Sequence, residues 1–152
     1  MTTRRETLKH SAVVAGLLGA TGLFPQYAIA AFNKSAFSAK SLADAFKALG
    51  VGTPVESTGV TIQAPDIAEN GAVVPVGATS TLAGVKQILF LVEKNPTVLI
   101  ALFNLSDRVD AAITTRTKMA QSSDVYAVAV MNDGKVLYAK KEVKVTLGGC
   151  GG

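Results

Sequence analysis

From Val60 onward, apolar and polar positions alternate in short stretches that turn residues separate. Residues 60–64 and 124–130 alternate with a period of two, which is typical of half-buried strands. Residues 98–105 form a more continuous apolar run, as expected of a central strand. The Asn-Asp-Gly sequence at 132–134 is a strong hairpin turn. Seven strands are predicted, over residues 60–64, 73–76, 85–92, 98–105, 109–117, 124–130 and 135–146.

Turn signals separate these stretches at intervals of about ten residues, without a helical pattern between them. This pattern predicts an all-β chain folded as an immunoglobulin-like antiparallel β-sandwich, with a small barrel as the alternative. Pro75 lies in the second stretch and predicts an edge strand or a bulge, because proline cannot donate to a ladder. Lys140, Lys141 and Lys144 are typical of a charged edge strand. No internal repeat and no second domain is predicted.

One short N-terminal helix is predicted within residues 31–50. Its apolar positions recur at helical spacing, and Gly50 is placed to end it. Either Ser38 or Ser41 is suited to cap its start. An apolar stripe of this kind packs on its own domain more often than it forms a groove for a partner. The stripe consists of Leu42, Ala45, Phe46 and Leu49.

Residues 1–30 have the pattern of an export signal that is removed from the mature protein. Arg4 and Arg5 precede an apolar run over residues 11–24, and a small-residue cleavage pattern follows at 28–30. The adjacent arginines resemble the twin-arginine type of signal, which implies a periplasmic protein. The apolar run is too short for a stable membrane span, so no membrane partner is expected. The alternative is an ordinary amphipathic N-terminal helix.

Charge and histidine content exclude several classes of function. The chain has 15 basic and 11 acidic residues, for a net charge of +4, and part of this excess belongs to the signal through Arg4, Arg5 and Lys9. No basic run with interleaved aromatic residues remains, so nucleic acid is not an expected partner. His10 is the only histidine and lies in the signal. The mature chain therefore cannot build a Ser-His-Asp or Cys-His arrangement or an imidazole metal site, and we expect no catalytic or metal site.

The stretch APDIAENG, residues 64–71, offers oxygen atoms from Asp66, Glu69 and Asn70. A hard cation such as calcium takes six or more oxygen ligands, which one short loop does not supply by itself. We therefore interpret this stretch as a surface loop. Three further charged residues are predicted to lie in a turn between strands: Asp107, Arg108 and Asp110.

The only cysteine, Cys150, lies in the C-terminal sequence GGCGG. Glycine has the largest conformational entropy to lose on ordering, so residues 148–152 predict a mobile arm. Extended, this arm reaches roughly 16–18 Å and is thin enough to pass a narrow channel. Without a charged neighbour, the thiol is mostly protonated at neutral pH and is an attachment point, not an activated nucleophile. The flexible arm is formed by Gly148, Gly149, Gly151 and Gly152 around Cys150.

A single cysteine in an exported protein either pairs with another molecule or stays free to react. Two hypotheses follow for Cys150. The protein is a carrier that holds its substrate covalently, or it is a structural or interaction protein whose cysteine forms an intermolecular disulfide. A disulfide-linked dimer is compatible with both.

Four stretches of the chain resemble the SoxY family of sulfur carriers. They are KEVKVTLGGCGG (141–152), APDIAENGAVVPV (64–76), EKNP (93–96) and TRTKMAQSSDVYAVAV (115–130). The resemblance implies an immunoglobulin-like carrier domain over residues 51–147 that pairs with a SoxZ-type subunit of related fold. It also implies that Cys150 carries covalent sulfur adducts and that the chain has no resident cofactor.

The resemblance further implies a set of enzymes that act on the carried sulfur. A SoxAX-type c-haem enzyme would join thiosulfate to Cys150, and a SoxB-type manganese hydrolase would release sulfate and leave a persulfide. A SoxCD-type molybdenum-haem sulfane dehydrogenase would oxidise that sulfur further in organisms that have one; otherwise the sulfur would pass to storage. The expected function is that of a non-catalytic periplasmic carrier in thiosulfate oxidation.

Overall fold

The computed structural model describes residues 33–147 and, before them, only residues 10 and 13. Arg4 and Arg5 of the predicted signal lie outside the described residues, as does the predicted arm at 148–152. Within the described part, no helix is long and apolar enough to cross a membrane.

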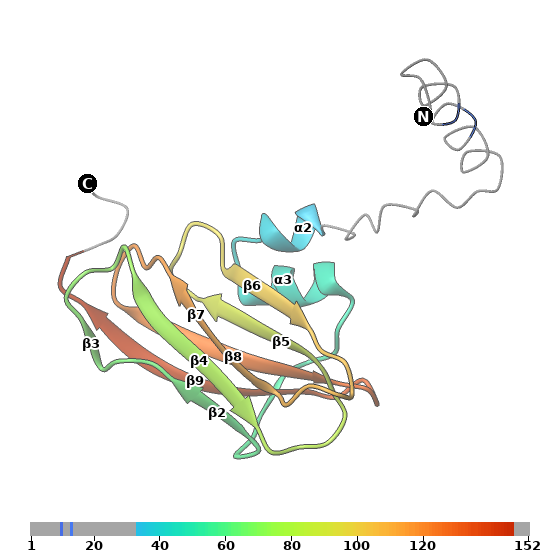
Figure 1. The fold of residues 1–152 in the computed structure, drawn as a ribbon. Coiled ribbons are helices and arrows are strands. Elements are labelled where there is room, and N and C mark those ends of the chain that lie inside the picture. The colour runs from blue at the N-terminus through green and yellow to red at the C-terminus, as the bar shows by residue number, and fades with distance from the viewer. Residues whose placement is uncertain (1–9, 11–12, 14–32, 148–152) are drawn as a thin grey trace, which may run out of the picture. The chain divides into compact units, whose positions relative to one another are not determined.

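The described chain forms nine strands in two packed sheets (Figure 1). The larger sheet has the order β1-β9-β8-β5-β6, with β3 also pairing with β9, and the smaller sheet has the order β2-β4-β7. The predicted immunoglobulin-like sandwich is confirmed, and the alternative of a barrel is wrong. The strands are β1 (Val55–Glu56), β2 (Val60–Gln63), β3 (Ile67–Ala68), β4 (Val74–Ser80), β5 (Val85–Val92), β6 (Leu99–Asn104), β7 (Ala112–Thr117), β8 (Ser123–Met131) and β9 (Val136–Val145).

The core between the sheets is built from alternate residues of the long strands, because successive side chains of a strand point to opposite faces. Ile88, Phe90 and Val92 of β5 are fully buried there, together with alternate residues of β4 and β8. The ring of Phe90 meets the ring of Phe103 on β6 edge to face, with centroids 6.2 Å apart. This contact joins the middle of the larger sheet to its outer strand.

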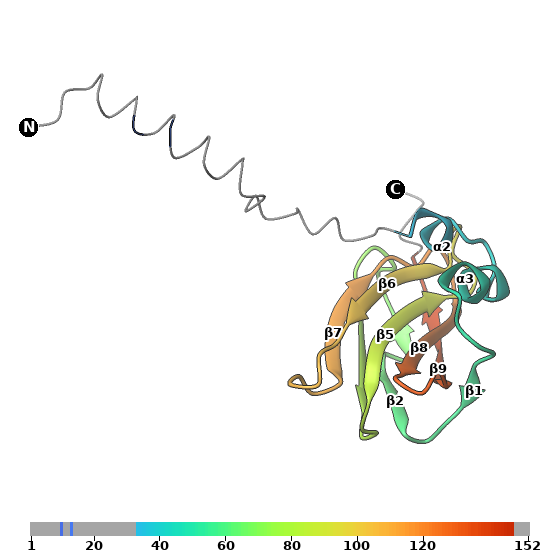
Figure 2. The ribbon, with the colours of Figure 1, turned by 90° about the vertical axis from the view of Figure 1, so that its right-hand side faces the viewer.

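Two short helices, α2 (Lys34–Phe37) and α3 (Leu42–Leu49), cover part of the outer face of the larger sheet (Figure 2). The single predicted helix is therefore two, because the N–H group of Ser38 bonds to carbonyls of the first turn and ends α2 instead of starting α3. Ser41 is the cap of α3, and Gly50 ends it at φ +66° in the left-handed region that glycine tolerates. The predicted packing of the apolar stripe on its own domain is confirmed, since Phe46 is buried against the sheet.

Replacing Ser41 by alanine should lower the free energy of unfolding by about 1 kcal/mol. The Ser41 Oγ accepts a hydrogen bond from the Asp44 N–H at 3.1 Å, and alanine leaves that N–H without its cap. Urea denaturation would measure the change, with Ser41→Asn as the control that keeps a capping oxygen. Equal stability of the alanine variant and the wild type would contradict this role of Ser41.

The prediction of an edge strand or bulge at Pro75 is wrong, because β4 is the central strand of the smaller sheet. The proline is tolerated because β2 pairs with β4 only from Gly77 onward. The backbone N–H of Ser80 points towards the β7 side of β4. Because N–H groups alternate in direction along a strand, the N–H groups of every second residue back to Val74 also point towards β7. The nitrogen of Pro75 therefore points to the β2 side. At Pro75 that side has no strand, and the missing N–H costs no ladder bond.

The prediction of a central strand at residues 98–105 is also wrong, because β6 is at the edge of the larger sheet. The apolar residues of β6 pack on both faces of the larger sheet. Ile100 and Phe103 pack on the core between the sheets, whereas Leu99 and Leu102 pack on the side that the helices cover. A strand covered on both faces is apolar throughout, whether or not it has two neighbouring strands.

Two strands were not predicted. β1 and β3 have two residues each and pair with β9 in parallel, while all other ladders are antiparallel. They occupy only the two ends of this β9 edge, so the prediction of an edge strand is wrong at Lys144, which pairs with Ile67, whereas no strand pairs with that edge at Lys140 and Lys141. Lys140 instead bonds to Asp124 at 2.8 Å, and Lys141 to Asp66 at 3.0 Å.

Candidate functional site: the root of the C-terminal segment

The predicted attachment residue Cys150 and its glycines Gly148, Gly149, Gly151 and Gly152 lie outside the described residues. The described chain ends at Leu147, two residues after β9, and the side chain of Leu147 is 66% exposed. The site can therefore be built from the residues that hold the chain as far as Leu147.

On one edge of β9, a side chain replaces a strand as hydrogen-bond partner. The ladder with β8 ends at the pair of Ser123 with Val143. Beyond it, the Ser122 Oγ accepts the N–H of Val145 at 2.9 Å and lies 3.5 Å from the Val145 carbonyl oxygen, to which it donates. The hydroxyl of Ser122 thereby extends the fastening of β9 by two residues.

The other edge of the same segment is held by residues 66–71. The Thr146 N–H bonds to the Ala68 carbonyl at 3.1 Å, and the Thr146 Oγ1 donates to the Glu69 carbonyl at 3.0 Å. The N–H of Gly71 then donates to the Leu147 carbonyl at 2.7 Å. The backbone up to Leu147 is thus held on both edges although the strand ended at Val145.

Two neighbouring loops support this arrangement. The Met119 N–H donates to the Gly71 carbonyl at 2.7 Å, and both Met119 and Gly71 are buried. Asn95 bridges to the same loop, because its Nδ2 donates to the Lys118 carbonyl at 2.7 Å and its Oδ1 accepts the Ala120 N–H at 3.0 Å. We call this set the root cluster; it comprises Glu69, Gly71, Asn95, Met119, Ser122, Thr146 and Leu147.

The surface at this end of the sandwich carries more basic than acidic groups. Among the described residues, the salt bridges involve only lysines 135, 140 and 141, so the exposed basic groups near the root cluster have no carboxylate partner. These are Lys94, Arg116, Lys118 and Lys144, against the exposed acids Glu69, Glu93 and Glu142, which form no salt bridge either.

The interpretation of APDIAENG as a surface loop is correct only in part, because Ile67 and Ala68 within it form β3. Asp66 is paired with Lys141, and the Oδ1 of Asn70 accepts the Ala72 N–H at 2.8 Å, which leaves no converging set of oxygens. Across the described part of the chain, no three His, Cys, Asp or Glu residues lie together as metal ligands. Asp107, Arg108 and Asp110 lie in the connection between β6 and β7, as predicted.

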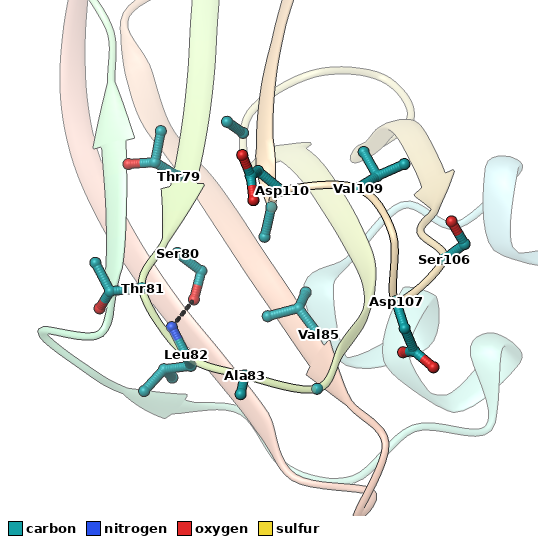
Figure 3. A pocket seen from close by; sticks show the side chains of 13 residues that line it. Thr79, Ser80, Thr81, Leu82, Ala83, Val85, Ser106, Asp107, Val109 and Asp110 are labelled. Atoms are coloured by element: carbon teal, nitrogen blue, oxygen red, sulfur yellow. Dashed lines mark hydrogen bonds between the residues drawn. The ribbon is translucent and has the colours of Figure 1, made fainter.

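A cavity of about 620 Å³ lies at the opposite end of the sandwich (Figure 3). It lies between the β4–β5 and β6–β7 connections and is open, with the side chains of Asp107 and Asp110 at its rim. The Ser80 Oγ there accepts the Leu82 N–H at 3.2 Å. The seven residues of β4 separate this cavity from the root cluster by roughly 20 Å, so the two cannot form one site.

A smaller groove of about 310 Å³ lies between α3 and the outer face of the larger sheet. Tyr126 and Tyr138 line it with Leu42, Phe46 and Pro54. Burial, followed by the negative charge of nearby Glu93, raises the pKa of the Tyr126 phenol above its ordinary value. Tyr126 therefore stays protonated at neutral pH.

The fold and the root cluster define an immunoglobulin-like β-sandwich whose last strand is fastened up to the point where a short C-terminal segment leaves it. The sequence profile of the sulfur oxidation protein SoxY matches residues 46–150. The chain belongs to the SoxY family.

Comparison with solved structures agrees with this assignment. The sulfur carrier protein SoxY from Chlorobium limicola f thiosulfatophilum is 34% identical, with a TM-score of 0.60 over 69% of this chain and 96% of that one. The superoxide reductase (neelaredoxin) from Ignicoccus hospitalis is 20% identical, with a TM-score of 0.51 over 57% of this chain and 79% of that one, and this likeness shows the fold alone. No sequence match to a curated protein was found.

The sequence did not predict the root cluster, although a signal for it was present. Three stretches that resemble the SoxY family, at 64–76, 93–96 and 115–130, are far apart in the chain. In the structure, Gly71, Asn95 and Ser122 of these stretches meet around the end of β9. The family-like residues thus gather at the end of the sandwich from which the Cys150 segment leaves.

Proposed function

We propose that the protein is a periplasmic sulfur carrier in thiosulfate oxidation. It holds thiosulfate-derived intermediates covalently on Cys150 and presents them in turn to the active sites of partner enzymes. The observation that carries the proposal is the family match over residues 46–150, which ends on the only cysteine of the chain. The fastening of β9 up to an exposed Leu147 supports it, because it gives the following segment a fixed origin at the surface.

The chemistry of loading requires an oxidant that the chain does not contain. The Cys150 thiol and one thiosulfate ion lose two electrons and one proton, and a bond forms between Sγ and the outer sulfur of thiosulfate. The c-type haem of a SoxAX-type partner accepts the two electrons. The sequence supports the view that a partner enzyme carries out this oxidation, because the chain has no histidine after residue 10 that could act as a general base.

Release then proceeds by hydrolysis without a further oxidant. Water attacks the terminal sulfonate sulfur, and the bond between that sulfur and its sulfane neighbour breaks. Sulfate leaves, one proton of the water goes to the sulfane sulfur, and the other goes to solvent. Cys150 keeps one additional sulfur atom as a persulfide. A SoxB-type manganese hydrolase carries out this step, and a SoxCD-type dehydrogenase oxidises the remaining sulfur where it is present. A SoxZ-type subunit forms the heterodimeric carrier with this chain.

The charge near the root cluster suits this cargo. Thiosulfate and its cysteine adduct are anions, and the four basic residues Lys94, Arg116, Lys118 and Lys144 outnumber the three nearby exposed acids that form no salt bridge. Basic side chains around the origin of the arm favour an anionic adduct over a neutral one and raise its local concentration. This contribution should weaken as salt increases, because the charges are exposed.

The mass of the intact mature protein tests the proposal. After incubation with thiosulfate, a SoxAX-type enzyme and an electron acceptor, the wild type should gain the mass of one S₂O₃ group. Addition of a SoxB-type hydrolase should reduce this gain to one sulfur atom. Cys150→Ser is the matched control. A purely structural cysteine predicts only a disulfide-linked dimer and no sulfur adduct, and that result would overturn the carrier function.

Bulky replacements in the arm should slow loading without changing the fold. Gly149→Leu together with Gly151→Leu adds side chains to a segment that has to enter a narrow channel, so the loading rate should fall at least about tenfold. The initial rate of adduct formation measures the effect, and unchanged urea denaturation is the control for folding. An unchanged loading rate would exclude a narrow channel as the reason for the glycines.

A further inference from the structure

We infer that the hydroxyl groups of Ser122 and Thr146 are positioning elements that set the reach of Cys150. The inference rests on the proposed carrier function but concerns a different part of the molecule. It assigns to the root cluster the role of fixing where the segment that contains Cys150 begins. The Ser122 hydroxyl bonds to the backbone of Val145 on one edge, and the Thr146 hydroxyl, which belongs to the extension of β9, donates to the Glu69 carbonyl on the other edge.

The position of the fastening determines how far the thiol can travel. With the chain held at Leu147, Cys150 lies three residues further along the chain, which corresponds to a span of roughly 10–11 Å. If the fastening were lost back to Val143, the last residue paired with β8, four more residues would be released. They would add up to roughly 13–14 Å, so the span would more than double.

A fixed origin benefits a carrier that visits several enzymes. A longer free segment reaches farther, but it loses more conformational entropy each time it is ordered in an active site. A segment that is too short fails to reach the reacting atoms. The root cluster keeps the length of the free segment constant, because the chain starts from the same anchor for every partner enzyme.

The bonds at the root are not what a strand end requires by default. A strand can end by fraying into solvent, yet here a serine side chain takes the place of a neighbouring strand at Val145. The Gly71 N–H holds the last described carbonyl, and the Gly71 carbonyl is itself held by buried Met119. Asn95 fixes the loop that contains Met119 through two further bonds.

Ser80 provides a matched control at the opposite end of the sandwich. Like Ser122, it is half-buried, and its Oγ accepts one backbone N–H, that of Leu82, at 3.2 Å. It also donates to the Gly59 carbonyl at 2.9 Å. Ser80→Ala therefore removes a hydroxyl with the same kind of bonds, without touching the root cluster.

The first experiment measures amide hydrogen exchange of Val145 and Gly71 and does not depend on sulfur chemistry. Losing one hydrogen bond should shift the balance towards the released root by roughly 2- to 12-fold, and Ser122→Ala should raise both exchange rates accordingly. Ser80→Ala should leave them unchanged, and Ser122→Thr should retain wild-type rates. Equal exchange in the wild type and in Ser122→Ala would overturn the inference.

The second experiment asks whether releasing the root compensates for a shortened arm. Deletion of Gly148 from the mature protein should slow enzymatic loading of Cys150, while its reaction with a small thiol reagent stays unchanged. Adding Ser122→Ala to this deletion should restore part of the loading rate, whereas adding Ser80→Ala should not. A merely structural role of Ser122 predicts further damage instead of rescue, and that result would contradict the inference. If the wild type takes up no sulfur, the proposed function fails, and hydrogen exchange alone decides whether the root is fastened by Ser122.

Discussion

Replacement of Cys150 by serine is expected to abolish thiosulfate-dependent electron transfer in a system rebuilt from the carrier and its partner enzymes. Serine keeps the size and polarity of the side chain, but its oxygen cannot form the sulfur–sulfur bond that holds the substrate. Electron transfer to a c-type cytochrome should therefore fall to the rate without carrier. The whole effect depends on one atom, because the chain has no second cysteine.

Several controls keep this result interpretable. The Cys150→Ser variant should retain the unfolding free energy of the wild type, because its tail follows the last residue of the fastened segment. It should also still co-purify with a SoxZ-type subunit if that contact is made by the sandwich. Full turnover by the serine variant would show that sulfur is not carried on this residue.

Replacement of Phe90 by alanine is expected to lower the free energy of unfolding by about 3–5 kcal/mol. Phe90 is fully buried at the centre of the larger sheet, and its ring meets that of Phe103 edge to face. Removing the ring loses its burial and leaves a cavity between the sheets. Small domains have total stabilities of about 5–15 kcal/mol, so this single change removes a large fraction.

Urea denaturation of the mature protein would measure this loss. Phe103→Ala is the matched control, because Phe103 belongs to the edge strand β6 and is only half-buried, so its loss should be smaller. A change of less than about 1 kcal/mol for Phe90→Ala would contradict the view that the two sheets share one tightly packed core.

The sequence predicted the elements whose signal is local. The strand at 85–92 matches β5 residue for residue, and the turn at 132–134 is the β8–β9 hairpin with Gly134 at φ +86°. These predictions succeed because alternation and turn chemistry act within a few residues. The cap at Ser41 and the end at Gly50 are local signals of the same kind.

Features that depend on the neighbours in space were not predictable in this way. The apolar character of residues 98–105 reflects cover by helices on one face, not two flanking strands, and Pro75 is tolerated in a central strand because β2 stops at its level. β1 and β3 have two residues each, too few to show a period. Their pairing with β9 is set by the packed structure.

The candidate site shows the same division. Cys150 and its glycines, which lie outside the described residues, were predicted from the sequence because their composition is unusual, whereas the residues of the root cluster carry no local signature. Thr146 bonds to the Glu69 carbonyl across 77 positions of sequence, and Asn95 to Ala120 across 25. Contacts at such separation become visible only once the sheets are assembled.

Peptide mapping of the loaded carrier tests the central claim most directly. Cleavage after Lys144 releases the C-terminal peptide 145–152, which contains the only cysteine of the chain and no basic residue. After incubation with thiosulfate and the loading enzyme, this peptide should carry one S₂O₃ group that a reducing agent removes, and every other peptide should be unchanged. An unmodified C-terminal peptide in a protein preparation that supports thiosulfate oxidation would contradict the account.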